Sequence, residues 1–468
     1  MFTYHESAVT PEFRQAILQR FPLTSRRAPC LRLLDHLLFG TAVDVDERLL
    51  MLPYELLEQF RNGSGKTKNF SAGKLLEKFD REFFPIEYRS HSAITGKVRL
   101  LTDVQFPYWL IEARDEMLRQ PATARTVRLV SGKPADLKAD VVNLRSQALA
   151  ASPPAKSAMA QDVLDYLNGL DESLFDHLPA RVADALSLIE TFEPGSRAVQ
   201  SSLIGSIHCC PKPLYRAVSN SARLYPAGPS FLGLKSCVRD LFTEGWIKLD
   251  LRQAQFAILS SLWEAEGLRS YVHSVTGSVW DDLIVRSGMV SSSDAKSAVK
   301  QAVYSMLYGS QENNVRRRLA KEVGSEAADR FLALPIVRLI LDQREDRCKR
   351  LYSELGVDDA YGNRLELPPF ENKRQWRREA MSILACQAQS YELPTLYPLI
   401  EYSRQTAETR DPFVVTAWLH DGVWAACSPD SAERHLAHVE DLVRASSAKY
   451  LGFIMQLDTE TPHRNRDK

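Results

Sequence analysis

Two lysines and two tyrosines recur every four residues in the segment 296–309. Lys296, Lys300, Tyr304 and Tyr308 stand at this spacing, and Gly309 follows them. An α-helix turns about 100° per residue, so a four-residue step keeps side chains near one face. Ammonium groups bind phosphates, and flat aromatic rings stack on nucleobases. The segment therefore predicts a helix with one face suited to a nucleoside triphosphate.

Two aspartates stand at positions where strands are expected to end or turn. Residues 245–262, GWIKLDLRQAQFAILSSL, predict a strand that ends at Asp250 and a helix after it. Residues 414–428, VVTAWLHDGVWAACS, are apolar on both sides of His420-Asp421 and predict a β-hairpin with this dipeptide at its bend. Taken singly, each feature has an ordinary explanation, such as a helix cap or a solvated helix face. Their occurrence together favours a functional interpretation.

The order of these segments resembles that of the family A nucleotidyltransferases. This family comprises bacterial DNA polymerase I, the related phage DNA polymerases and the single-subunit phage RNA polymerases. Its motif A is a strand ending in Asp, its motif B a helix with basic and aromatic residues before Tyr-Gly, and its motif C a His-Asp hairpin. Asp250, the segment 296–309 and His420-Asp421 match these motifs in order. The resemblance covers roughly residues 200–460 and leaves the first 200 residues without a match.

The resemblance implies an α+β fold of the right-hand polymerase type, with a palm built on an antiparallel sheet and with helical fingers and thumb. A mostly helical N-terminal accessory domain would precede it, with template binding as one role. The expected segments are an accessory domain at 1–125, a helical thumb-like region at 126–200, a palm from 201–262 and 385–468, and fingers at 263–384.

The resemblance also implies two-metal phosphoryl transfer. Asp250 and Asp421 would hold two Mg²⁺ ions, with Mn²⁺ as an alternative, because hard cations prefer carboxylate and phosphate oxygens. Lys296 and Lys300 would hold the β- and γ-phosphates. Lys300 would also protonate the leaving pyrophosphate as a catalytic residue.

The residues expected beside the sugar and the base leave the choice of sugar open. Tyr304 would pack on sugar and base, and Tyr308 would sit beside the template base. Gln255 stands where family DNA polymerases carry a Glu that blocks the ribose 2′-hydroxyl, and it matches that Glu in size. Gly422 stands where the DNA polymerases carry a Glu, and the RNA polymerases likewise lack this Glu. On balance these residues favour a DNA polymerase, with an RNA polymerase, a primase or a non-catalytic nucleic-acid-binding module as alternatives.

Further matches concern the primer and the template. Segment 222–242 is similar to the arginine-containing stretch before motif A, and YGNRLELP at 361–368 resembles a segment after the fingers. The residues that the resemblance places against primer-template are Arg223, Arg239, Gly309, Arg364, Gln387 and His420. We expect no proofreading exonuclease. Asp458-Thr459-Glu460 is similar to a first exonuclease motif, but only eight residues follow it, too few for the other carboxylates of such a domain.

The composition is typical of a globular protein and leaves nucleic-acid binding open. The 468 residues carry 59 basic and 59 acidic side chains, so any polyanion site must be a local concentration of charge. Seven cysteines without a CxxC pair argue against a disulfide framework. We expect neither a signal peptide nor a membrane span, and hence a cytoplasmic protein that works as a monomer or in a replication complex on primer-template and nucleoside triphosphates.

The N-terminal quarter predicts mostly helices with some strand. Residues 31–40 and 47–60 have helical apolar spacing, whereas 97–111 is richer in strand formers. GSGKT at 63–67 lacks the earlier glycine and the buried strand of a phosphate loop, so we interpret 62–74 as a basic turn. Residues 150–160 are expected to be a linker.

Overall fold

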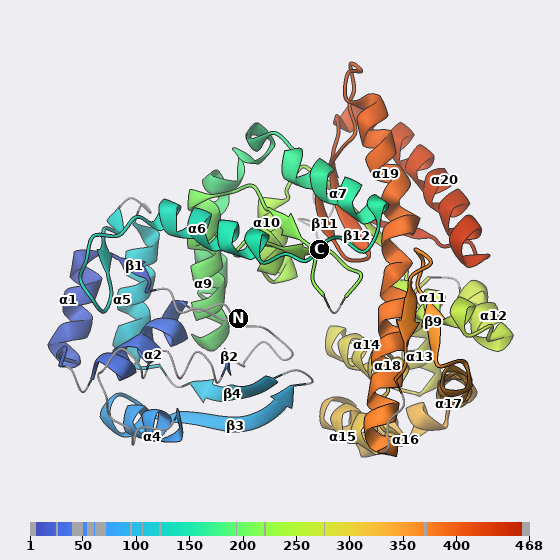
Figure 1. The fold of residues 1–468 in the computed structure, drawn as a ribbon, viewed down its shortest axis with the longest axis horizontal. Helices are drawn as coiled ribbons and strands as arrows, with labels where there is room; N and C mark the ends of the chain where they lie inside the picture. The colour runs from blue at the N-terminus through green and yellow to red at the C-terminus, as the bar shows by residue number, and fades with distance from the viewer. Residues whose placement is uncertain are drawn as a thin grey trace. The chain divides into compact units, whose positions relative to one another are not determined.

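The computed structural model divides the chain into two compact units (Figure 1). The structure describes residues 6–460 apart from 25–26, 40–49, 54–59, 61–71, 94–95, 105, 121–123, 193, 220, 276 and 369–371. Most of the basic turn at 62–74, including GSGKT, lies outside the described residues. Unit 1 is formed by Met1–Ala151, Leu170–Tyr215 and Pro226–Glu244, and unit 2 by Ser152–Gly169, Arg216–Tyr225 and Gly245–Lys468.

Unit 1 is a group of helices around α9. Helix α9 packs against α2, α5, α6 and α8, and its buried residues include Leu203, Ile204 and Ile207. Thr10 caps α1, accepting a hydrogen bond from the Phe13 amide at 3.3 Å. The helices of the unit are α1 (Pro11–Arg20), α2 (Ala28–Phe39), α4 (Ala72–Glu82), α5 (Tyr108–Arg119), α6 (Leu137–Ala150), α8 (Val182–Ile189), α9 (Pro194–Cys209) and α10 (Ser236–Phe242).

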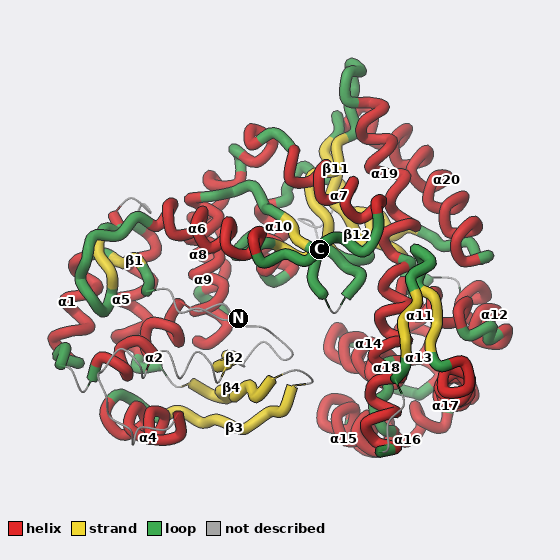
Figure 2. The backbone as a smooth tube through the Cα atoms, viewed as in Figure 1, coloured by secondary structure: helices red, strands yellow, loops and turns green. Residues whose placement is uncertain are grey.

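A three-stranded antiparallel sheet in unit 1 corrects the prediction of helix over 47–60. Strand β2 (Leu50–Pro53) pairs with β4 (Gly96–Val104), which also pairs with β3 (Ile86–Ala93), and Figure 2 shows β3 and β4 side by side. Short apolar runs fit either a helix or a strand, and here the neighbouring strand decides between them. The strand expected from residue 97 ends at Val104, and α5 begins after Pro107, since proline suits the start of a helix. The short strands β1 (Ala8–Val9) and β5 (Val127–Arg128) form a second pair.

Unit 2 is built on a four-stranded antiparallel sheet with the order β11-β12-β8-β13. The strands are β8 (Ile247–Leu251), β11 (Val414–Leu419), β12 (Gly422–Ala426) and β13 (Leu457–Glu460). Helices α19 (Glu392–Thr406) and α7 (Ala158–Gly169) pack on β11, and α20 (Ala432–Leu451) packs on α19 (Figure 1). Alternating side chains of β8 are buried, as expected for a strand with a core-facing side.

The other helices of unit 2 follow β8 in the chain. Helix α14 packs against α11, α13, α15 and α17, and α18 packs against α11, α17 and α19. A small hairpin of β9 (Gly356–Asp358) and β10 (Arg364–Glu366) lies beside α18. These helices are α11 (Ala254–Leu262), α12 (Glu266–Ser274), α13 (Val279–Arg286), α14 (Ser293–Leu307), α15 (Glu312–Val323), α16 (Ser325–Ala333), α17 (Pro335–Glu354) and α18 (Lys373–Ser390).

The α+β class is confirmed, and so are the three elements that were expected to carry chemistry. Strand β8 with α11, helix α14 and the hairpin β11–β12 form where the sequence predicts them. The expected linker at 150–160 is shorter than predicted, because α7 begins at Ala158. The assignments to palm, fingers, thumb and accessory domain, with their boundaries, stay predictions. None of the helices in the described part of the chain combines the length and apolar character that crossing a bilayer requires.

Candidate active site

Strand pairing brings Asp250 and Asp421 together at one end of the unit 2 sheet. Gly422 is the register partner of Asp250 across the β12–β8 pair. The Leu251 amide donates to the Asp421 carbonyl oxygen at 2.8 Å. Two carboxylates that are 171 residues apart in the sequence therefore approach each other because their strands are hydrogen-bonded neighbours.

Gly422 leaves the space that the Asp250 carboxylate needs. A Cβ at this position would lie 2.8 Å from Asp250 Oδ1 and 3.0 Å from the Leu249 carbonyl oxygen. Any larger side chain, including the Glu that the resemblance would place here, requires the neighbouring atoms to move. The sequence shows the glycine, but only the strand pairing explains it.

Both turns next to the aspartates use a left-handed backbone without glycine. His420 has φ 57° in the hairpin bend, and Gln253 has φ 54° between β8 and α11. Such conformations cost about 1 kcal/mol or more and often occur where function requires a fixed geometry. The His420 ring also lies edge-on to Tyr225, with centroids 5.1 Å apart. Burial and then the nearby Arg223 guanidinium lower the pKa of His420 to about 4, so the ring is neutral at physiological pH.

The two carboxylates repel each other in a partly dry site. Burial, followed by the charge of Asp421, raises the pKa of Asp250 to about 7. The ammonium groups of Lys248 and Lys300 oppose this shift. Lys300 on α14 therefore interacts with the aspartate pair on the sheet, which links the basic helix to the carboxylates.

Helix α14 presents its lysines and tyrosines opposite a buried apolar side. Ser292 caps the helix by accepting a hydrogen bond from the Ala295 amide at 3.1 Å. Lys296 pairs with Asp281 of α13 at 2.8 Å, whereas Lys300 is exposed with its Nζ 5.9 Å from the Tyr304 ring centre. The side chains on the buried side are Ala295, Ala298, Val299, Ala302, Val303, Met306 and Leu307.

The two tyrosines face the aspartates across the site. Tyr304 lies edge-on to Trp280 at 5.4 Å and 6.4 Å from Tyr308, measured between ring centroids. Burial and then Asp421 raise the pKa of Tyr304. Burial and then Glu392 raise the pKa of Tyr308. Both hydroxyls therefore stay protonated and able to donate hydrogen bonds.

The C-terminal end of α14 is held by a buried arginine that sequence reasoning did not find. Arg344 of α17 donates to the carbonyl oxygens of Met306 at 2.7 Å and Ser310 at 3.0 Å. Gly309 adopts φ 93°, and a Cβ there would lie 2.5 Å from Met381 Cγ. A cation at a helix C-terminus satisfies carbonyl groups that lack helical partners. No spacing rule in the sequence signals this role for one arginine among many.

A buried network joins Arg223, Glu392, Gln255 and Tyr308. Arg223 Nε donates to Glu392 Oε2 at 2.6 Å, and both a second Arg223 nitrogen and the Gln255 amide nitrogen donate to Oε1. The Tyr308 hydroxyl donates to Gln255 Oε1 at 2.6 Å. Burial raises the pKa of Glu392 to about 7 against the opposing effect of Arg223. Sequence reasoning missed Glu392, because an acid in the first turn of a helix normally indicates only a favourable helix dipole.

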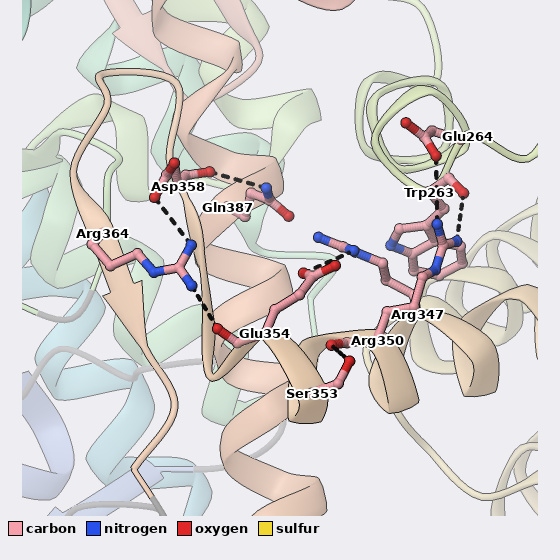
Figure 3. A network of polar contacts seen from close by, with 9 residues as sticks. All are labelled: Trp263, Glu264, Arg347, Arg350, Ser353, Glu354, Asp358, Arg364 and Gln387. Atoms are coloured by element: carbon pink, nitrogen blue, oxygen red, sulfur yellow. Dashed lines mark hydrogen bonds and ion pairs between the residues drawn. The ribbon is translucent and has the colours of Figure 1, made fainter.

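The residues expected to contact primer-template are distributed between the two units. Arg223 and His420 lie near the aspartates, whereas Arg239 belongs to unit 1 and donates to the Leu232 carbonyl oxygen at 3.2 Å. Figure 3 shows Arg364 and Gln387 on either side of Asp358. Gln387 donates to the Asp358 carbonyl oxygen at 3.0 Å, and Arg364 donates to its carboxylate at 3.3 Å.

The pair of aspartates suits a hard divalent cation in its chemistry. Two adjacent carboxylates, one with a raised pKa, supply oxygen ligands whose mutual repulsion a cation would relieve. In the described part of the chain, no group of three or more His, Cys, Asp and Glu side chains could hold a metal. Further ligands would have to come from phosphate oxygens and water, as is usual for Mg²⁺.

Comparison with known proteins gives a distant structural likeness. No family model matches the chain, and no curated protein matches it. Among solved structures, the chain is similar to the POL domain of Pol1 from M. smegmatis, solved in complex with DNA primer-template and dNTP. The match covers 69% of this chain and 64% of the Pol1 domain, so this chain spans less than two thirds of the length of that domain. The sequence identity is 14% and the TM-score 0.43.

Proposed function

We propose that this protein is a template-directed DNA polymerase that adds deoxynucleotides to a primer 3′-hydroxyl by two-metal phosphoryl transfer, without proofreading. The observation that carries the proposal is the meeting of Asp250 and Asp421 beside Lys300 of α14. Two carboxylates for cations and an ammonium group for phosphate are the groups that nucleotidyl transfer requires. The proposed right-hand arrangement places the sheet of unit 2 in the palm and α14 in the fingers.

In this proposal Asp250 and Asp421 would hold two Mg²⁺ ions, or Mn²⁺ in their place. When bound, such ions would supply activation of the primer 3′-hydroxyl and charge neutralisation for the leaving pyrophosphate. Lys300 binds the triphosphate and gives a proton from Nζ to the leaving pyrophosphate oxygen. Lys296 binds the distal phosphates after it leaves Asp281, the carboxylate that it pairs with here.

The tyrosines and Gln255 would form the wall of the nucleotide site. Tyr304 packs on the sugar and base, and Tyr308 lies beside the template base. Gln255 is buried five residues after Asp250, and its side chain points to the Tyr308 hydroxyl. A glutamine of this size in that place would leave no room for a ribose 2′-hydroxyl, which favours deoxynucleotides.

Primer extension with dNTPs and Mg²⁺ tests the proposal. Asp250→Ala and Asp421→Ala should each lower incorporation by about a thousandfold or more, because the lost charge stabilisation is worth several kcal/mol. Asp458→Asn is the matched control. Asp458 is the register partner of Asp250 on β13, but it is half-exposed and pairs with Arg252 at 2.6 Å, so activity should persist. Normal extension by either alanine variant would refute the two-metal assignment.

The same assay separates the alternatives. Products from rNTPs on a primer-free template would indicate an RNA polymerase or primase instead. Template binding without incorporation of either nucleotide class would indicate a non-catalytic nucleic-acid-binding protein.

A further inference from the structure

Glu392 is a buried carboxylate with no part in the chemistry described above. It is the first residue of α19 and is 1% exposed. Both of its oxygens accept hydrogen bonds, which Arg223 and Gln255 donate. Burying a carboxylate is costly unless it is paired and hydrogen-bonded, so this arrangement calls for a reason beyond packing.

The carboxylate determines which way the Gln255 amide points. Arg223 pairs with Glu392 and favours its ionised form, which only accepts hydrogen bonds, so the amide nitrogen of Gln255 faces the carboxylate. The amide oxygen then faces Tyr308 and accepts its hydroxyl proton at 2.6 Å. The reversed amide would place oxygen against carboxylate. Glu392 and Tyr308 thus fix the amide nitrogen and the amide oxygen of Gln255, respectively.

We propose that Glu392 is a positioning residue for sugar selection, because it keeps Gln255 in place beside the incoming sugar. This inference rests on the proposed function. A side chain excludes a 2′-hydroxyl only while it cannot rotate away. Gln255, near the start of α11, contacts residues at the ends of two other helices. These are Tyr308, directly after α14, and Glu392, the first residue of α19. The contact at α19 is the charged one, and hydrogen bonds to charged groups are the stronger class.

A simpler role for Glu392 would be to neutralise Arg223. The two roles differ in what shortening the side chain does. Glu392→Asp keeps a negative charge opposite Arg223 but withdraws the carboxylate by one methylene from Gln255. Neutralisation alone predicts an unchanged choice of sugar in this variant, whereas positioning predicts a weaker one.

The test is the ratio of kcat/KM for dNTP to kcat/KM for rNTP in primer extension by the full chain. Glu392→Asp and Glu392→Gln should each lower this ratio about tenfold, mainly by lowering KM for rNTP. The exchange Glu392→Gln with Gln255→Glu restores a carboxylate–amide pair and should recover most of the ratio. Asp162→Asn is the control, because Asp162 pairs with Arg404 at the far end of α19. It should leave the ratio unchanged.

The possible outcomes separate this inference from the proposed function. A wild-type ratio in folded Glu392→Asp, or equal losses with both nucleotides, would overturn the positioning role alone. A wild-type protein that uses both sugars equally would also overturn it. If the wild-type protein incorporates neither nucleotide, the proposed function fails and the inference falls with it. If Glu392→Gln does not fold, Glu392→Asp decides.

Discussion

At the scale of single residues, the site balances function against stability. Asp250 and Asp421 are held close together although burial and the negative charge of Asp421 raise the pKa of Asp250. Such an arrangement destabilises the metal-free protein and is expected where two carboxylates serve a cation. The residue that makes it possible, Gly422, carries no chemistry of its own.

Asp250→Asn should stabilise the metal-free protein while abolishing incorporation. The folded pKa of Asp250, about 7, lies above its ordinary value of 3.8, so between these values the folded state holds a proton that the unfolded state has released. The contribution of Asp250 to stability therefore falls as the pH rises from about 4 to 7. In EDTA at pH 8 the variant should gain about 2 kcal/mol, and at pH 4 almost nothing. Urea unfolding at both pH values measures this, and an equal effect at both would contradict it.

Gly422→Ala should lower activity while the fold persists. The new Cβ would lie 2.8 Å from Asp250 Oδ1, so the carboxylate must shift by a fraction of an ångström. Displacements of this order at reacting groups reduce rates by about tenfold to a hundredfold. Gly169→Ala is the control, since apart from its own helix no atom among the described residues lies within 4 Å of a Cβ there. Steady-state extension rates compare the two, and equal rates would show that Asp250 tolerates the methyl group.

At the scale of elements, the C-terminal end of α14 is fixed by hydrogen bonds with other helices of unit 2. The apolar side of α14 packs in the core, but Tyr308 lies beyond its last turn, where helices fray. Arg344 of α17 holds this turn through two carbonyl oxygens, and Gly309 lets the chain bend past Met381. Tyr308 is therefore positioned from both sides, by Arg344 through the backbone and by Gln255 through its hydroxyl.

Arg344→Met should destabilise the protein by about 2 kcal/mol, because it removes a charged donor from the carbonyl oxygens of Met306 and Ser310. Nucleotide KM should rise as well, since Tyr308 loses its support. Arg317→Met on the exposed side of α15 should change stability by less than about 0.5 kcal/mol. Thermal unfolding compares both variants with wild type. An Arg344 variant as stable as the Arg317 variant would show that the helix end needs no such support.

At the scale of the whole molecule, unit 2 is assembled from three separate stretches of chain. The earliest contains α7, which packs on α19 and β11. Its Tyr166 hydroxyl donates to the Val415 carbonyl oxygen at 3.2 Å, and its Asp162 pairs with Arg404 at 2.7 Å. The second stretch contributes Arg223. The C-terminal stretch alone therefore lacks part of its core and the partner of Glu392.

Residues 245–468 expressed alone should not fold cooperatively. Without α7, buried apolar surface on α19 and β11 is exposed, and without Arg223 the buried charge of Glu392 has lost its cation, a change that costs about 3–5 kcal/mol. Near-UV circular dichroism and urea unfolding, with the full chain as reference, measure the effect. A native-like spectrum and a single sharp transition for the fragment would show that the earlier stretches are dispensable for the fold.

The sequence by itself was enough to predict the strand at Asp250, which runs one residue further to Leu251, the helix that carries Lys296, Lys300 and Tyr304, and the His420-Asp421 hairpin. Each of these rests on local periodicity and turn chemistry, which a few neighbouring residues specify. Only the tertiary structure decided that Leu50–Pro53 is a strand, that Gly422 makes room for Asp250, and that Arg344 and Glu392 hold α14 and Gln255. These depend on partners that are distant in sequence, and the energy of a buried hydrogen bond or a close approach has no local signature. Local patterns therefore predicted the elements that carry Asp250, Lys300 and Asp421, whereas the residues that position these side chains had no local signal.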